Sequence, residues 1–464
     1  MKPDYARGFA SIHEEQPQVM ASLQGALPDW LQGTLFRNGP ALWHAGVTPL
    51  KHWFDGFAML HSFTMGQGKV SYRNRFLQTP DLLATRARGR LMHPQFASDP
   101  CRGLFKKVVS MFVSELGSNP NVNVTQLGTR FLALTETPMA IEFDPETLAT
   151  AGLYNYDRDH FGGQITSAHP IVEAGILYNF TVGLGKSSRY RGYQTQTGPR
   201  REFAHHPTRH PAYLHSCALT PREMVLWEGP LVVQPLDLLY RQRPYIENYR
   251  WRPELGSRLI LLDRQGGSRA LELPPLFVFH HVNSFYQQDT LCVDVLAYPD
   301  ASIIEHLYLD RLCAPEGPPV PAPRLTRVRL EKGGPVLEVL SPVSLELPRI
   351  FERQGTPYRY VYGISQRQSR FFDALARVDC QGGEPLLWFE DGCFPGEPVP
   401  VTSPDHRQRL LLSVVLDCAR GQSFLLILQA DTFAEVARAY VPAVVPFGFH
   451  GGFWPTQRGF STSL

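Results

Sequence analysis

The sequence predicts an all-β protein whose segments fit the radial sheets of a β-propeller. Glycine (38) and proline (40) make up about a sixth of the 464 residues, and this turn density disfavours long helices. Hydrophobic residues account for 43% and charged residues for 19%, enough apolar material for a large core and too little charge for disorder. Short strand-like runs joined by polar turns recur along the chain, as blades of short antiparallel strands require.

The individual elements follow the same pattern from end to end. In segment 131–156, β-branched and aromatic runs flank DPETL (144–148), which is typical of a reverse turn between two strands. Comparable strand pairs occupy 257–273, 372–389 and 422–441. Only two segments, 21–33 and 80–92, are expected to be helical. No linker divides the chain, since the Pro-rich stretch 314–328 fits a surface connection, so we expect one propeller domain over residues 1–464.

Charge and cysteine usage exclude several classes of protein. Lys+Arg 45 against Asp+Glu 43 leaves a net charge of +2, which predicts no nucleic-acid partner. The seven cysteines contain no C-x-x-C pair and indicate free thiols in a reducing compartment. The N-terminal residues lack the apolar core of a signal peptide, and no run of about 18 apolar residues occurs. The sequence indicates a cytoplasmic protein, at most peripheral to a membrane, and no obligate protein partner.

The histidines carry the main chemical signal. Four of the sixteen lie among apolar or small residues at strand edges, namely His169, His215, His280 and His450. One such residue is more often a hydrogen-bonded core histidine than a metal ligand, because a buried imidazole must satisfy both ring nitrogens. Four of them in separate strands could meet on the axis of a propeller. Local spacing such as H-E-x-x-H is absent, so a metal site would be assembled from distant strands. The cluster 205–210 is a weaker candidate because proline breaks its spacing.

At these motifs the chain resembles the carotenoid cleavage oxygenases. The resemblance covers nearly the whole chain and includes the four histidine motifs, in order, together with LFRNGP (35–40), HWFDGFAMLHSF (52–63), NPNVNV (119–124) and GFHGGFW (448–454). It implies a seven-bladed propeller with iron on the axis and a cap of loops and short helices that forms the substrate tunnel.

The resemblance also implies a ligand set. Its members would be His169, His215, His280 and His450, holding one Fe(II) per chain with dioxygen as co-substrate. The family pattern Phe-His followed by a variable residue selects His280 over its neighbour. No catalytic residue beyond the iron centre is implied.

Three glutamates match positions that orient the ligands in this family. The resemblance pairs Glu136 with His215, Glu346 with His280 and Glu397 with His450, and leaves His169 without a carboxylate. Each glutamate lies in an apolar, Pro-flanked stretch, where a solvated carboxylate would be unusual. A metal-bound imidazole needs such an acceptor for its second N–H.

Several positions depart from the family pattern. The usual Asn-Thr-Asn reads Asn-Val-Asn at 121–123, Gly-Asp-Gly is replaced within 56–60, and Tyr286 stands where an acidic residue is common. PDHRQR (404–409) replaces an acidic run. No ligand is lost, but the substrate and the position of the reaction stay open.

The activity implied is oxidative cleavage of a conjugated C=C bond in a carotenoid or apocarotenoid, giving two carbonyl products. The 15,15′ bond, which would yield retinal-like apocarotenals, is one candidate. Alternatives are a stilbene-cleaving oxygenase, a non-oxidative retinoid isomerohydrolase and a propeller that only binds partners. Stilbene-type members use a lysine just upstream of Asn-Thr-Asn, whereas the nearest lysines here are Lys106 and Lys107, which favours the polyene.

An insoluble substrate requires access to a membrane. In segment 229–245, Leu236, Leu238 and Leu239 adjoin Arg241 and Arg243, a combination that suits a patch at the lipid interface. The alternative is a buried strand followed by a charged turn. On the first interpretation the protein is cytoplasmic and peripherally membrane-associated.

Overall fold

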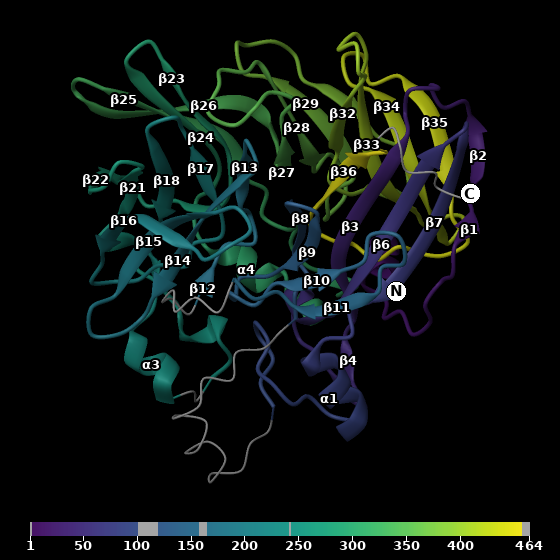
Figure 1. Ribbon diagram of the computed structural model, residues 1–464, viewed down its shortest axis with the longest axis horizontal. Coiled ribbons are helices and arrows are strands. Elements are labelled where there is room, and N and C mark those ends of the chain that lie inside the picture. Colours follow the sequence, from purple (N-terminus) through teal and green to yellow (C-terminus); the bar gives the residue numbers. More distant parts are fainter. Residues whose placement is uncertain (1, 101–118, 157–164, 241–242, 457–464) are drawn as a thin grey trace.

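Seven antiparallel sheets surround a common axis in the computed structural model, which describes residues 2–100, 119–156, 165–240 and 243–456 (Figure 1). Each sheet is one blade, and consecutive blades follow one another along the chain. The all-β fold and the seven-bladed propeller are therefore confirmed.

The first four blades come mainly from the N-terminal half. Blade 1 contains β1 (Val19–Met20), β7 (Lys69–Phe76), β6 (Phe57–Gly66), β3 (Gly33–Leu42) and β36 (Gly451–Pro455). Blade 2 contains β11 (Thr150–Leu153), β10 (Ile141–Phe143), β9 (Arg130–Leu134) and β8 (Asn123–Leu127). Blade 3 contains β12 (Ile165–Thr166), β13 (Ile171–Glu173), β14 (Ile176–Gly183), β15 (Arg189–Thr195) and β16 (Arg201–Pro207). Blade 4 contains β17 (Cys217–Leu219), β18 (Glu223–Glu228), β21 (Ser257–Asp263) and β22 (Ser268–Leu273).

The remaining blades complete the ring. Blade 5 contains β23 (Phe277–Gln287), β24 (Thr290–Tyr298), β25 (Arg324–Glu331) and β26 (Gly334–Ser344). Blade 6 contains β27 (Glu346–Arg349), β28 (Tyr360–Ser365), β29 (Ala374–Asp379) and β30 (Leu386–Trp388). Blade 7 contains β2 (Ser22–Gly25), β35 (Glu435–Tyr440), β34 (Gln422–Gln429), β33 (Arg409–Asp417), β31 (Cys393–Pro395) and β32 (Val399–Thr402).

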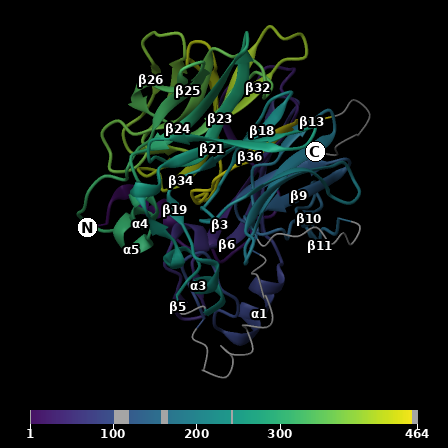
Figure 2. The same ribbon diagram turned by 90° about the vertical axis from the view of Figure 1, so that its left-hand side faces the viewer.

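Short helices and two small two-stranded sheets form a cap on one side of the propeller (Figure 1 and Figure 2). The two small sheets pair β4 (His44–Ala45) with β5 (Thr48–Pro49) and β19 (Leu231–Val232) with β20 (Arg250–Trp251). The α-helices are α1 (Pro80–Arg88), α3 (Pro235–Tyr240), α4 (Ser302–His306) and α5 (Leu309–Leu312). The 3₁₀ helices are η1 (Asp4–Phe9), η2 (Trp53–Asp55), η3 (Ile246–Asn248) and η4 (Pro253–Leu255). Of these cap elements, α1, α3 and β4 lie at the lower end in Figure 1.

One expected helix is confirmed and the other is wrong. Helix α1 begins after Thr79, whose hydroxyl accepts the Leu82 N–H at 3.1 Å, and it ends at Gly89 in the left-handed conformation. Segment 21–33 instead contributes β2, which pairs with β35. Pairing with a strand some 400 residues away outweighs the local helical pattern.

The turn at 144–148 is confirmed between β10 and β11. Asp144 initiates it, because its Oδ1 accepts the Thr147 N–H at 2.7 Å. The cysteines of the described residues are free thiols, and five of these six are buried. Cys101 lies outside the described part of the chain.

Both chain ends take part in closing the ring. The N-terminal β2 joins blade 7, and the C-terminal β36 pairs with β3 in blade 1, with Gly451 opposite Arg37. The segment before β36 passes so close to β3 that a Cβ on Gly39 would lie 2.4 Å from the Cα of Gly448. A glycine at this crossing is therefore a packing requirement.

We expect Gly39→Ala to lower the thermal unfolding temperature, because the added methyl overlaps backbone that cannot move aside, at a cost of about 1–3 kcal/mol. Gly333→Ala is the matched control, since a Cβ there has no atom within 4 Å. Differential scanning calorimetry compares the two variants. Equal unfolding temperatures would show that the closing segment is free to shift.

Candidate metal centre

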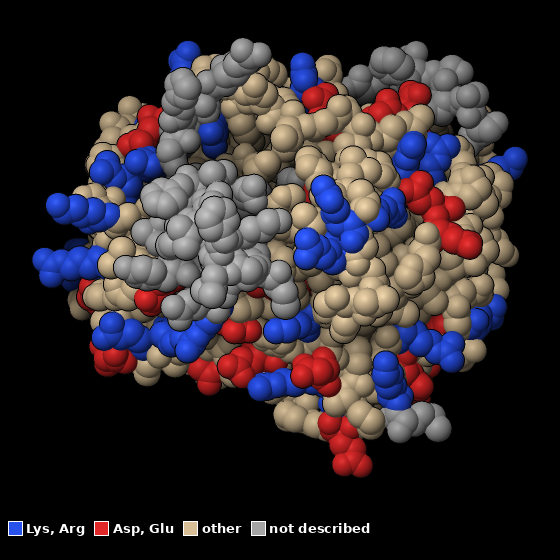
Figure 3. Space-filling model, turned by 90° about the horizontal axis from the view of Figure 1, so that it is seen from below, with Lys and Arg blue, Asp and Glu red and all other residues tan. Residues whose placement is uncertain are grey.

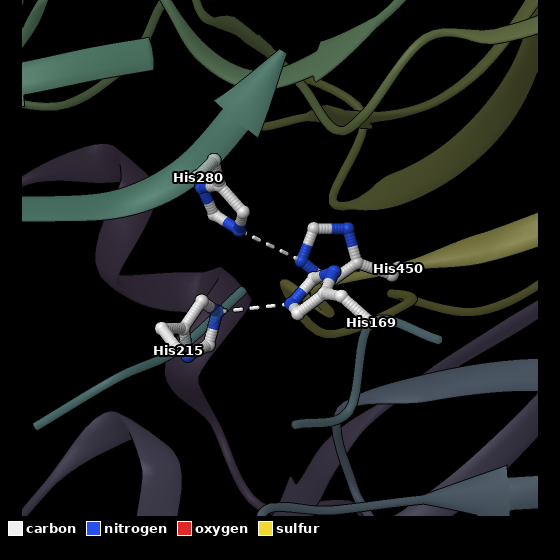
Figure 4. Close-up of side chains that lie close together, drawn as sticks. All are labelled: His169, His215, His280 and His450. Atoms are coloured by element: carbon white, nitrogen blue, oxygen red, sulfur yellow. Dashed lines mark hydrogen bonds between the residues drawn. The ribbon is translucent and has the colours of Figure 1, made fainter. Parts of the chain in front are cut away.

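The four histidines singled out by the sequence lie together on the propeller axis (Figure 4). His169 follows β12, His215 precedes β17, His280 lies within β23 and His450 precedes β36. Each of these strands is the terminal strand of its sheet. One ring nitrogen from each histidine lies within 4.8 Å of those of the others.

Two short contacts define the cluster. The Nε2 atoms of His169 and His215 are 3.0 Å apart, and those of His280 and His450 are 3.2 Å apart. Two imidazole nitrogens at right angles about a metal, each about 2.1 Å from it, would be about 3 Å apart. The spacing of the donors therefore fits a single metal ion among them.

Three glutamates determine which nitrogen of each ring faces the axis. Glu136 accepts the Nδ1–H of His215 at 2.6 Å, and Glu346 accepts that of His280 at 2.6 Å. Glu397 does the same for His450 at 2.7 Å. A carboxylate can only accept, so Nδ1 carries the proton in all three rings and Nε2 presents a lone pair.

This assignment explains why the cluster suits a cation. The Nε2 atoms of His280 and His450 face each other as two lone pairs, with no proton available to join them. Burial lowers the pKa of His450 to about 3 and also lowers the pKa of His169 and of His215. These three rings, of His169, His215 and His450, stay neutral at pH 7, which is the state in which imidazole binds metals.

No glutamate holds His169 or His281, the two other histidines of this region that the structure describes. Within the described residues no carboxylate contacts His169, whose backbone N–H donates to Ser167 Oγ at 2.9 Å. His281 turns away from the axis, and its Nδ1 lies 2.9 Å from Ser216 Oγ. The structure thus places His280, rather than its neighbour, with the other three histidines.

Further contacts of the glutamates were not anticipated from the sequence. The hydroxyl of Tyr213 donates to Glu136 at 2.6 Å and that of Tyr298 to Glu346 at 2.8 Å. Both phenols have a raised pKa because they are buried beside a carboxylate. Tyr213 lies two residues before His215, which is the only sequence signal that could have indicated it.

Glu397 differs from the other two carboxylates because its extra partners are charged. Arg37 and Arg349 both donate to it, the latter at 2.8 Å. Burial alone would raise the pKa of Glu397, but these guanidinium groups and His450 hold it well below the usual range. Arg37 lies in the motif LFRNGP quoted above, and Arg349 lies three residues after Glu346, but no sequence pattern assigns either arginine a partner.

A cavity of about 460 Å³ joins the histidines to the cap. At its inner end it is lined by His215, His280 and His450, together with Val122 of the altered Asn-Val-Asn motif. Most of its wall is apolar or aromatic, with Trp53, Phe54, Phe96, Phe279, Phe372 and Phe449. A long apolar molecule could reach the cluster mainly in contact with apolar and aromatic side chains.

The outer end of the cavity meets helix α3, where the sequence placed an apolar patch. Leu238 lines the cavity and Leu236 is 62% exposed, while the side chain of Leu239 and residue Arg241 lie outside the described part. The preceding residues 231–233 are buried, so the apolar run is divided between core and surface. In the part of the chain that the structure describes, no helix is both long and apolar enough to cross a membrane.

The comparisons with known proteins agree with this arrangement. Residues 9–455 match the family of the retinal pigment epithelial membrane protein. The chain is 29% identical to β,β-carotene 15,15′-dioxygenase of Mus musculus, covering 95% of this chain and 90% of that protein. It is 30% identical to the Gallus gallus enzyme of the same name, covering 96% and 98%.

Solved structures show the same fold. A variant of the Synechocystis apocarotenoid oxygenase superposes with a TM-score of 0.88 at 26% identity, covering 98% of both chains. The cobalt-substituted form of that enzyme gives a TM-score of 0.87 over the same coverage. The resemblance to the carotenoid cleavage oxygenases is thereby confirmed, and the chain belongs to the family of the retinal pigment epithelial membrane protein.

Proposed function

We propose that this protein is a carotenoid cleavage dioxygenase that binds one Fe(II) through His169, His215, His280 and His450. The observation that carries the proposal is the convergence of four imidazoles, three of them oriented by glutamates, at the end of a largely apolar cavity. Family membership and the named dioxygenases among its relatives support the same activity. Both oxygen atoms of O₂ enter the products, so that one C=C bond becomes two carbonyl groups.

Iron is the metal that fits this activity. Four neutral imidazoles add no charge, so a divalent ion among them would keep its full positive charge. A ligating carboxylate would instead neutralise part of that charge. Bound Fe(II) would supply the activation of dioxygen. The surrounding residues have simpler tasks: the glutamates orient the rings, and the aromatic wall positions a polyene and keeps water out.

The cavity favours a polyene over a stilbene. Gripping a phenol hydroxyl requires a polar anchor near the metal, and the described lining contains no lysine. Lys106 and Lys107 lie outside the described residues. The position of the reacting bond is a finer proposal: the 15,15′ bond is the first to test, because relatives named for that bond match almost the whole chain.

The test is to incubate iron-loaded protein under ¹⁸O₂ with β,β-carotene, a series of apocarotenals, resveratrol and a retinyl ester. Mass spectrometry should find paired aldehydes or ketones from a polyene, each carrying one ¹⁸O. Cleavage at 15,15′ would give retinal. Turnover of resveratrol alone, or unlabelled retinol from the ester, would replace the proposal with one of the alternatives, and no turnover with no bound iron would indicate a binding protein.

The neighbouring histidines of blade 5 offer a matched pair of variants. His280→Ala should abolish iron binding and cleavage, because it removes a lone pair that faces the cluster. His281→Ala should retain iron, because that ring contacts Ser216 instead. Iron per chain, measured by mass spectrometry of the metal, distinguishes the two. Loss of iron in the second variant alone would show that the ligand register is shifted by one.

The glutamates should act through their histidines. Glu136→Gln, Glu346→Gln and Glu397→Gln should each weaken iron binding by about 10–100-fold, since an amide is a weaker acceptor for the Nδ1–H. Competition with a chelator measures the dissociation constant. Glu142→Gln on the surface of blade 2 is the control, because its partner is the exposed Arg130. Wild-type affinity in all four proteins would contradict the pairing.

The same proposal includes contact with a membrane. Helix α3 presents Leu236 outward, while Leu238 of the same helix and Arg243 line the cavity. Exposed leucine and arginine side chains in one segment suit contact with acyl chains and phosphates. Figure 3 views the molecule from below, where basic and acidic side chains are interspersed among uncharged residues.

We expect Leu236→Glu to reduce sedimentation with anionic liposomes and cleavage of substrate dissolved in them, while cleavage of detergent-dispersed substrate is unchanged. The physical reason is the cost of bringing a carboxylate to the acyl boundary. Val339→Glu is the control, because Val339 is 61% exposed on β26, away from the cavity lining. An equal effect of both variants would place the contact elsewhere.

A further inference from the structure

The three glutamates that hold the histidines are not electrically equivalent. Glu136 and Glu346 take their additional side-chain hydrogen bonds from the neutral hydroxyls of Tyr213 and Tyr298, and Glu346 also accepts the Leu347 backbone N–H. Glu397, 1% exposed, instead receives hydrogen bonds from two guanidinium groups, those of Arg37 and Arg349. One buried carboxylate facing two cations leaves a net positive charge beside His450 and nowhere else among the three pairs.

The two arginines also hold the backbone on either side of His450. Arg37 donates to the carbonyl of Phe449 at 2.8 Å, and Arg349 donates to that of Gly451 at 2.6 Å. The Gly451 N–H in turn donates to Glu397 at 3.2 Å. His450 is thus held through its ring and through both neighbouring peptide groups by one cluster of three charged side chains.

We call Arg37, Arg349 and Glu397 the clamp, and their positions in the fold show why His450 needs it. Residues 441–450 form neither helix nor strand, so His450 is not placed by a regular ladder of hydrogen bonds on both sides. Arg37 comes from β3 of blade 1, Arg349 from the end of β27 in blade 6, and Glu397 lies between β31 and β32 of blade 7. The clamp therefore joins three blades at the point where the C-terminal strand closes the ring.

The charge of the clamp has a chemical consequence. A carboxylate shared between two guanidinium groups is a weaker acceptor for the Nδ1–H of His450 than one bound to a hydroxyl. A ring with a weaker acceptor donates less electron density from Nε2. The nearby positive charge acts in the same direction, because it disfavours the more highly charged oxidation state of a metal.

We propose that Arg37 and Arg349 are positioning residues that fix His450 and, through Glu397, make it the weakest electron donor of the three histidines that a glutamate holds. The clamp thereby raises the Fe(III)/Fe(II) potential and favours the ferrous state. This inference rests on the proposed iron site.

Arg349 is the residue to change, because its side chain is 32% exposed and tolerates substitution better than the buried Arg37. Arg349→Met removes the charge and the carbonyl contact, whereas Arg349→Lys retains the charge. Arg327→Met is the matched control: Arg327 also forms a partly buried pair, donating two hydrogen bonds to Asp294 at 2.7 and 2.8 Å, but it lies outside the metal cluster.

Two measurements on iron-loaded protein test the proposal. Spectroelectrochemistry should show a lower Fe(III)/Fe(II) potential in Arg349→Met, corresponding to at least a tenfold gain in relative affinity for Fe(III), or about 59 mV for one electron. The potential of Arg349→Lys should lie close to that of the wild-type protein. Hydrogen exchange should become faster in residues 445–455 of the Met variant. The control should lower the unfolding temperature and change neither reading.

The outcomes separate this inference from the proposed function. An unchanged or higher potential in Arg349→Met overturns the inference while leaving the iron site intact. Faster hydrogen exchange with an unchanged Fe(III)/Fe(II) potential would show that the clamp has only a structural role, and this result also overturns the inference. If the wild-type protein binds no iron, the proposed function itself fails.

Discussion

Three hydrogen bonds from histidine Nδ1 to glutamates in the interior of the propeller determine the chemistry of this protein. Each bond requires that Nδ1 carry the proton, and so each directs a lone pair on Nε2 towards the propeller axis. Without the carboxylates, either nitrogen could hold the proton and the rings could pair with one another instead of with a metal. Burial reinforces the arrangement, because it lowers the pKa of His215 and of His450 and strengthens the hydrogen bonds to the charged oxygens.

The propeller suits this requirement because it brings the terminal strands of different sheets to one line. The four histidines come from blades 1, 3, 4 and 5, and the glutamates from segments of blades 2, 6 and 7 or beside them. A donor set so dispersed is complete only when the ring is closed. His450 directly precedes β36, so the last ligand and the closing strand arrive on the same segment. The pairing of β36 with β3 therefore closes the ring and also brings His450 to the site.

Much of the fold and the histidine cluster could be predicted from the sequence, because both leave local signals. Alternating strands and turn residues indicate blades, and a histidine among apolar neighbours at a strand edge stands out by itself. The choice between His280 and His281 came from the family pattern, and the structure shows the reason, since the backbone turns successive side chains to opposite sides.

The remainder depends on contacts between distant segments. Nothing in the order of residues pairs Arg37 with a carboxylate 360 positions away, or β2 with β35. In the sequence, the segment after Gly229 is a single, mostly apolar stretch. In the structure, residues 231–233 are buried, whereas Leu236 is exposed on helix α3. Such divisions arise from tertiary packing, which overrides local preference.

An anomalous difference map at the iron edge, from crystals of the iron-loaded protein, is the most direct test of this arrangement. A single peak bounded by the Nε2 atoms of all four histidines, with the three Nδ1–glutamate bonds intact, is the expected result. A peak bound by a glutamate oxygen, or one that leaves any of the four histidines outside the site, would contradict it.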